Sequence, residues 1–358
     1  MKYILVCFIF LFVGCVNQSN LNNNDVVVYK DNKPIIKLDK NDNFEIDENI
    51  DTKNQTIAMV YASNEIGKYA IEATNSALTY LLNSNKDFQI KVYDIKSESV
   101  NNIQNILSEL ETKNIDKVIL MITAKYINNL FEYKDIDKFH IYLPLVNNTY
   151  KKNLPNIYYG GISYVKQFNY IEKDIENNSN IIEIYDDKSF GNMLHRKMDN
   201  SLLQGKIMKS IKIKGKNIVY SRIMERLKNI DNLNIILNTS IIKSSIFLSQ
   251  LRANDIEVKK IYSTQVNYSP LLLVLTQLED RKNLIVLNSI PTLSKNIYAL
   301  NEIMGNDILY NWVNCSVIIG VSYFINDYHL SWDLKFIDNQ IDYKIKSYDL
   351  SGYGFKTL

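Results

Sequence analysis

The sequence predicts an α/β protein built from two doubly wound, Rossmann-like lobes with a hinge and a central cleft. The first observation is an alternation, from Thr56 onward, of short apolar runs with amphipathic helical stretches. Such continuous runs are typical of parallel strands that helices cover on both faces. The second is that the alternation starts again near Ile181. The third is length, since 358 residues that are 46% hydrophobic suffice for two cores.

The elements of the first lobe follow from the apolar runs and the helical spacing between them. A polar turn at 63–65 separates the first strand from a helix with Ile66, Ala70 and Ala73 on one face. Ser99 is placed to cap the next helix, because its hydroxyl can accept a hydrogen bond from a free amide of the first turn. The predicted strands are 57–62, 88–95, 117–122 and 139–145, and a short helix is predicted at 124–131.

The second lobe repeats the pattern and ends differently. Its strands are predicted at 181–185, 206–213, 233–237, 258–262 and 283–287. Its helices are predicted at 190–203, 218–227 and 242–253, with another between 262 and 283. The apolar positions of the helix 242–253 include Ile242, Ile246 and Leu251. A long apolar helix follows at 308–324, and Asp338-Asn339 separates two alternating segments that predict a terminal hairpin.

The first residues resemble the export signal of a bacterial lipoprotein. Lys2 precedes an apolar stretch at 3–13 that is too short to span a membrane. The segment 12–15 resembles a lipobox, so cleavage after residue 14 would leave Cys15 to carry the lipid that anchors the chain to the membrane. The polar segment 15–54 would then be a flexible tether. The alternative is an ordinary secretory signal in which Cys15 is incidental. Val16, in place of Asp, favours the outer membrane, facing the periplasm.

Charge and cysteine usage exclude several classes of protein. The formal net charge is +2 without a basic stripe, so no nucleic-acid partner is implied. Cys7 lies in the signal and Cys15 would be acylated, which leaves Cys315 without an intrachain partner. Cys315 lies in an apolar helical stretch, where a small buried hydrophobic role is favoured over that of a nucleophile.

The sequence carries no motif that predicts an enzyme, a metal site or a cofactor. His140, His195 and His329 lie far apart and have no metal-ligand spacing. Neither a nucleophile elbow nor a phosphate-binding glycine loop is present. Asp186-Asp187 could be paired acid–base carboxylates, but acids at a helix N-terminus are favoured by the helix dipole, and we prefer that interpretation. We therefore expect a binding protein.

Several local motifs, in their order along the chain, resemble the type I periplasmic binding protein family from about Thr56 to Leu358. They are Ser63 with Gly67, Asp187-Lys-Ser-Phe-Gly191, Phe247-Leu-Ser-Gln-Leu-Arg252, and the close at 336–341 with 351–355. Within that family, the anchor and the terminal segment are similar to the C-terminal domain of the LppC/LpoA lipoproteins, outer-membrane activators of a penicillin-binding protein. This chain has only a short tether where those proteins carry a large helical-repeat domain.

The resemblance implies a domain organisation and a hinge. After the signal at 1–14 and the tether at 15–54, the resemblance places the first lobe at 55–161 plus 289–327 and the second lobe at 162–288 plus 328–358. The hinge crossings are expected near Gly160-Gly161, Asn288-Ser289 and Asp327.

The resemblance also implies that loops at the strand ends contact a ligand in the cleft. The matching positions are Ser63, Asn64, Thr123, Asn147, Tyr185, Asp187, Asn238, Thr239 and Ser240. One hypothesis is a small solute, such as an amino acid whose ammonium group Glu65 or Asp187 would balance. The other is an envelope protein such as a peptidoglycan synthase, with a cleft that has lost its solute.

Overall fold

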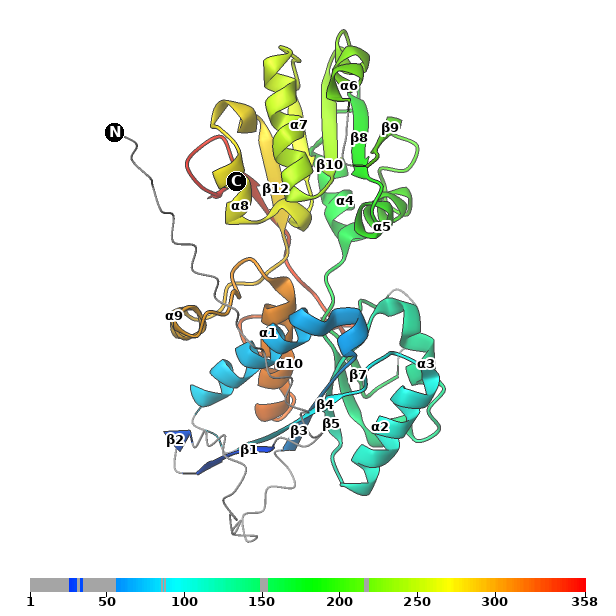
Figure 1. Ribbon diagram of the computed structural model, residues 1–358, viewed down its shortest axis with the longest axis vertical. Helices are drawn as coiled ribbons and strands as arrows, with labels where there is room; N and C mark the ends of the chain where they lie inside the picture. Colours follow the sequence, from blue (N-terminus) through cyan, green and yellow to red (C-terminus); the bar gives the residue numbers. More distant parts are fainter. Residues whose placement is uncertain are drawn as a thin grey trace, which may run out of the picture.

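The computed structural model describes residues 26–30, 33–34, 56–84, 86, 88–148, 154–215 and 219–358. These residues form two sheets, each with helices packed around it, that lie one above the other in Figure 1. The two-lobed α/β fold predicted from the alternating pattern is confirmed. The signal segment 1–14 and Cys15 lie outside the described residues.

The first sheet has the strand order β13-β14-β7-β6-β5-β3-β4-β1-β2. Its parallel centre consists of β3 (Thr56–Tyr61), β4 (Gln89–Asp94), β5 (Lys117–Met121), β6 (His140–Leu143) and β7 (Ile157–Tyr159). At one edge β1 (Val26–Lys30) pairs antiparallel with β4, and β2 (Lys33–Pro34) pairs with β1. These two strands lie within the segment 15–54 that the sequence analysis expected to be a tether. They pair here because the open edge of β4 offers backbone groups to an added strand.

Helices cover both faces of this sheet, as the continuous apolar strands predict. Ile57 and Met59 belong to a core shared with α1 (Ser63–Leu82) and α10 (Trp312–Ile325). Ala58 and Val60 point to the opposite core, formed with α2 (Val100–Thr112) and α3 (Ile127–Phe131). The outlying α9 (Lys295–Ile303) packs against α1. Both predicted helix signals are confirmed: Ile66, Ala70 and Ala73 are buried, and the Ser99 side chain accepts a hydrogen bond from the Asn102 amide.

The second sheet has the order β16-β15-β12-β11-β10-β8-β9. Its parallel part consists of β8 (Asn180–Asp186), β9 (Ile207–Ile213), β10 (Leu233–Asn238), β11 (Lys260–Ser263) and β12 (Leu284–Asn288). The terminal strands β15 (Lys346–Asp349) and β16 (Lys356–Thr357) are antiparallel. The helices are α4 (Tyr164–Asp174), α5 (Ser189–Asp199), α6 (Tyr220–Leu227), α7 (Ile241–Ala253) and α8 (Pro270–Leu275). Among all the helices in the described residues, none is long and apolar enough to cross a membrane.

The apolar positions of α7 differ from the sequence pattern. Ile242 and Ile246 are 61% and 42% exposed, whereas Phe247, Leu248 and Leu251 are buried. The buried face also contains Ser244 and Ser245, whose hydroxyls donate to backbone oxygens nearby. Because these hydroxyls are satisfied locally, a partly polar face can pack inward.

The third hinge crossing lies elsewhere than predicted. The chain passes between the sheets at 160–163, at 289–294 and at 342–345, so the expected crossing near Asp327 is wrong. The hairpin of β13 (Phe336–Ile337) and β14 (Gln340–Ile341), which was expected in the second lobe, adds to the first sheet beside β7. The chain therefore stays in the first lobe after α10 and crosses only after β14.

Candidate binding cleft and hinge cavity

The carboxyl ends of the parallel strands face the cleft from both lobes. The first crossing leaves the carboxyl end of β7 and enters the second lobe, and the strands parallel to β7 point the same way. The second crossing leaves the carboxyl end of β12 toward the first lobe, as Figure 1 shows. The loops after β3, β4 and β5 therefore look toward the loops after β8 and β10, which is where ligands bind in doubly wound sheets.

In the first lobe, the predicted contact groups are held by two acidic side chains. The Ser63 amide, at the start of α1, donates to Asp94 Oδ1 at 3.1 Å. Thr123 donates from its amide to Glu98 Oε1 at 2.7 Å and from its hydroxyl to Glu98 Oε2 at 2.6 Å. Glu98 is 1% exposed, and burial raises its pKa although the two bonds from Thr123 oppose that shift. Asn64 is exposed, and its amide donates to the backbone of the loop after β4.

In the second lobe, a lysine joins two carboxylates at the end of β8. The Ser240 amide, at the N-cap of α7, donates to Asp186 Oδ2 at 2.7 Å. Lys243 forms ion pairs with Asp186 and, at 3.4 Å, with Asp187. Asp187 also accepts the Gly215 amide at 3.0 Å, and this backbone bond is the main cause of the lowered pKa of its carboxyl. The helix that Asp186 caps is α7 and not α5, which directly follows it in the sequence.

Three further candidates lie deeper in the second lobe. The Tyr185 ring stacks on the His195 ring with centroids 4.2 Å apart. Asn238 is buried and donates to Glu183 Oε1 at 2.8 Å, while the other oxygen of Glu183 lies 2.6 Å from His195 Nδ1. The Thr239 hydroxyl lies 2.7 Å from that of Ser244. Their expected contact with a ligand stays a prediction.

The sequence analysis did not identify Asp94 or Glu98, and it assigned Asp186 to the N-terminus of the helix that follows it in the sequence. Asp94 ends β4 and Asp186 ends β8, so each lies at the carboxyl end of a strand, where a polar side chain faces the cleft. That position is the signal that could have identified them. Glu98 lies in a short loop before a helix, and nothing in its neighbours along the chain indicates that it turns inward to Thr123.

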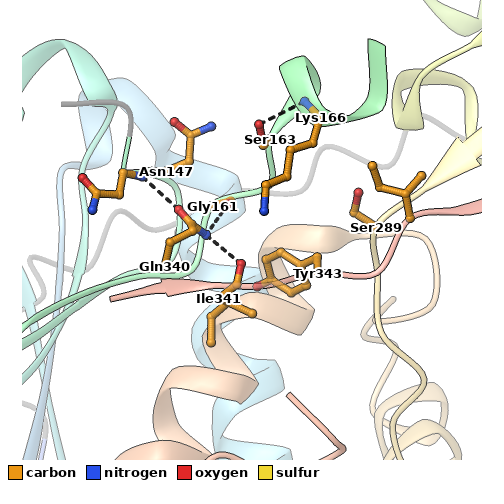
Figure 2. Close-up of a pocket in the computed structure, with 10 residues that line it drawn as sticks. Asn147, Gly161, Ser163, Lys166, Ser289, Gln340, Ile341 and Tyr343 are labelled. Atoms are coloured by element: carbon orange, nitrogen blue, oxygen red, sulfur yellow. Dashed lines mark hydrogen bonds between the residues drawn. The ribbon is translucent and has the colours of Figure 1, made fainter. Parts of the chain in front are cut away.

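A cavity lies at the hinge, between the three crossings (Figure 2). Its volume is about 110 Å³, which is room for roughly three or four waters at about 30 Å³ each. Its lining residues are Asn147, Asn148, Gly161, Ser163, Lys166, Ser289, Gln340, Ile341, Tyr343 and Ile345. Of the nine predicted contact residues, Asn147 lines this cavity and the other eight do not.

Gln340 ties the walls of this cavity together. Its side-chain amide donates to the backbone oxygens of Tyr159, Gly161 and Ile341, and its Oε1 accepts the Asn148 amide at 2.9 Å. Gly161 is packed so closely that an added Cβ would lie 2.4 Å from the Val146 carbonyl carbon. The cavity is therefore bounded by a tightly packed backbone.

His140 and Cys315, two residues considered in the sequence for metal binding and catalysis, lie in packed surroundings, and the described residues form no metal-binding cluster. No group of three or more potential ligands lies close enough in the described chain to hold a metal ion. The His140 ring packs on Tyr328 with centroids 4.5 Å apart, and burial lowers its pKa. Cys315 is buried, which raises the pKa of its thiol to about 12 and keeps it protonated and unreactive.

Comparisons with known proteins identify solved structures of the same fold. No family model and no curated protein sequence matches the chain. A protein from Rhodospirillum rubrum assigned to branched-chain amino acid ABC transport superposes with a TM-score of 0.67 at 11% identity, covering 85% of this chain and 99% of that one. Streptococcus pneumoniae LivJ, a branched-chain amino acid binding protein in complex with isoleucine, gives 0.56 at 11% identity, covering 85% and 99%.

A second group of neighbours consists of structures of LpoA from Haemophilus influenzae. The full-length protein gives a TM-score of 0.64 at 10% identity, and the match covers 85% of this chain but 59% of LpoA. Its C-domain, described as belonging to a regulator of PBP1A, gives 0.57 at 11% identity and is covered completely, 100%. The chain therefore spans about three fifths of full-length LpoA, and this likeness at low identity concerns the fold.

Proposed function

From the fold of the type I periplasmic binding proteins, which this chain has, we propose that it is a non-enzymatic lipoprotein of the bacterial cell envelope whose cleft binds a protein partner. The observation that supports a protein rather than a small solute is that hydrogen-bond donors of the cleft already bind acceptors within the chain. The Ser63 and Ser240 amides and both donors of Thr123 already bind carboxylates of the chain itself.

These donors lie where an anionic solute would otherwise bind. Amides at the start of a helix bind carboxylates and phosphates readily, because they lack partners within the helix and lie at its positive end. Asp94 takes this position at α1, and Asp186 takes it at α7. A solute carboxylate would have to displace one of them or Glu98, and leaving a buried charged group unpaired costs about 1–3 kcal/mol or more.

The proposed partner is a peptidoglycan synthase. This choice rests on the LpoA neighbours, one of which is described as a regulator of PBP1A. It agrees with an export signal at 1–14 and an anchor at Cys15, which would hold the lobes near the cell wall. Substitution of Cys15 by Ser is expected to abolish incorporation of labelled palmitate and to move the protein from the membrane fraction to the soluble one. Unchanged labelling would refute the anchor.

The partner is tested by direct binding between the purified full chain and a purified peptidoglycan synthase from the same organism. We expect saturable binding by biolayer interferometry together with a changed rate of glycan synthesis. Lys188 is exposed at the start of α5 on the cleft side. The substitution Lys188→Glu reverses its charge and is expected to weaken binding about tenfold, as changes of charge at the rim of an interface can.

The matched control is Lys173→Glu, in the last turn of α4, because that helix starts at the hinge and runs away from it. This control is expected to bind as the unmodified chain does. Absence of binding, or equal weakening by both variants, would refute the proposed partner site.

A small solute remains the second candidate, favoured by Asn147 in the hinge cavity and by the isoleucine complex of LivJ. Isoleucine, glucose and adenosine serve as probes of a solute site. We expect none of them to raise the melting temperature. A saturable rise with any of them would favour the solute, because a ligand of the native state stabilises it.

A further inference from the structure

All three interlobe crossings contribute side chains to the cavity at the hinge. Ser163 and Lys166 come from the first crossing and the start of α4, Ser289 comes from the second, and Tyr343 with Ile345 comes from the third. A molecule in this cavity would therefore contact every segment about which the lobes turn. This position distinguishes the cavity from the cleft proper, which the strand-end loops line.

Three side chains that carry hydrogen-bond donors line the cavity, namely Ser163, Lys166 and Ser289. The Lys166 side chain extends from α4 toward Gly161 and Gln340, as Figure 2 shows. The Ser163 hydroxyl accepts the Lys166 amide hydrogen, which leaves its own proton to donate. Ser289 is buried, and its hydroxyl likewise accepts from Gln167 Nε2 at 2.8 Å and keeps a proton to donate.

Among the residues that line the cavity, Lys166 carries the one charged side chain. Lys166 Nζ lies 3.1 Å from Asp342 Oδ1, and Lys335 Nζ lies 3.8 Å from the other oxygen of the same carboxylate. Two ammonium groups thus share one carboxylate, and the Lys166 ammonium group, which donates to Asp342, has further hydrogens to donate. Gln340 offers little to a ligand, because its amide already makes three backbone contacts.

Part of the cavity wall is apolar. Ile341, Tyr343 and Ile345 line one side, and the Tyr343 hydroxyl donates to the Gly160 oxygen at 2.7 Å. The volume of about 110 Å³ gives room for a molecule with a short carbon chain.

We propose that this hinge cavity binds a small carboxylate, such as acetate or glycine, through Lys166, Ser163 and Ser289, and that binding narrows the range of angles between the lobes. The carboxylate would accept a charge-assisted hydrogen bond from the ammonium group and neutral ones from the two hydroxyls. This site is separate from the proposed partner surface.

The test is a titration of the full chain, without any partner, with formate, acetate and glycine. Sodium chloride at equal ionic strength is the reference. We expect acetate and glycine to raise the melting temperature saturably and to reduce the spread of lobe angles seen by small-angle X-ray scattering. Lys166→Met should weaken binding at least tenfold, whereas Lys173→Met on the same helix should leave it unchanged.

Two results would overturn the proposal. One is the absence of a shift beyond that of sodium chloride, and the other is equal binding by the unmodified chain and Lys166→Met. If Lys166→Met does not fold, Ser289→Ala decides, because it removes one donor and leaves the charges in place. The titration contains no synthase, so its failure is separate from failure of the proposed function.

Discussion

Glu98 is a charged side chain that is almost completely buried and yet has a donor at each oxygen. Its partner Thr123 is a residue that the sequence assigns to ligand binding. Glu183 is a comparable case in the second lobe, because it is fully buried between Asn238 and His195. At the scale of single residues, the chain thus pairs its own acids with donors that the sequence assigns to ligand binding, and this pairing supports the proposed protein partner over a small solute.

Burial raises the pKa of Glu98, and the direction of that shift gives a prediction for stability. A folded-state pKa above the unfolded value means that the contribution of this group to stability is present at low pH. It is lost as the pH rises through the folded pKa. We therefore expect the free energy of unfolding of the unmodified chain, relative to Glu98→Gln, to increase as the pH is lowered from about 7 toward 4.

Urea denaturation at a series of pH values measures this difference. Glu257→Gln is the control, because Glu257 is exposed. A flat difference for Glu98, or an equal trend for Glu257, would contradict the argument.

The hairpin β13–β14 shows how one short element positions part of the hinge. Asp338 and Asn339 both have positive φ, 51° and 59°, as the two central residues of a type I′ turn require. The Asn339 side chain donates to the Leu154 oxygen, and its backbone oxygen accepts the Tyr159 amide. The turn thereby sets Gln340 against the first crossing, so local turn chemistry reaches the hinge cavity.

The backbone conformation of this turn predicts that two substitutions of Asp338 have different effects on the free energy of unfolding. Asp338→Val should lower the free energy of unfolding by about 1–2 kcal/mol, because a β-branched residue is strained at positive φ. Asp338→Gly should leave it unchanged or slightly raised, since glycine adopts this conformation without steric cost. Both variants keep the Asp338 backbone oxygen, which accepts a bond from Asn148. Equal stabilities for the two variants in urea would contradict the turn assignment.

An aromatic cluster joins the two lobes beside the hinge. Tyr310, just before α10 in the first lobe, lies 5.1 Å from the ring of Tyr268 and 5.9 Å from that of Phe355, which both belong to the second lobe. Tyr348 on β15 completes the cluster, 5.1 Å from Tyr268. Aromatic pairs of this kind contribute about 0.5–1.5 kcal/mol each beyond their buried area. The contact therefore restrains the angle between the lobes independently of any ligand.

Removing the Tyr310 ring should widen the distribution of lobe angles. Domains within one chain normally move relative to one another unless a large apolar interface holds them. Loss of the Tyr310 contact should therefore increase the motion between the lobes. Single-molecule energy transfer between a label on each lobe measures the distribution for Tyr310→Ala. Tyr353→Ala is the matched control, since Tyr353 is 92% exposed and belongs to the terminal segment that also carries Phe355, a contact of Tyr310. Identical distributions for all three proteins would refute the restraint.

Features that depend on neighbouring residues along the chain were predictable. The apolar runs of β3 and β5, the buried face of α1, the Ser99 cap and the hairpin turn all follow from periodicity or from turn residues. Each involves residues within a few positions of one another, so local physical chemistry determines it. The two-lobed α/β fold could be inferred from these elements because a repeated alternation has few compact solutions.

The tertiary structure alone decided the features that join distant segments. It put the terminal hairpin on the edge of β7, turned Ile242 and Ile246 of α7 outward, and brought Glu98 to Thr123. It also formed the hinge cavity from three crossings that are far apart in sequence. The reason is that sheet-edge pairing, burial of one helix face and satisfaction of a buried charge depend on which surfaces meet in space. Local sequence patterns do not specify which surfaces come into contact.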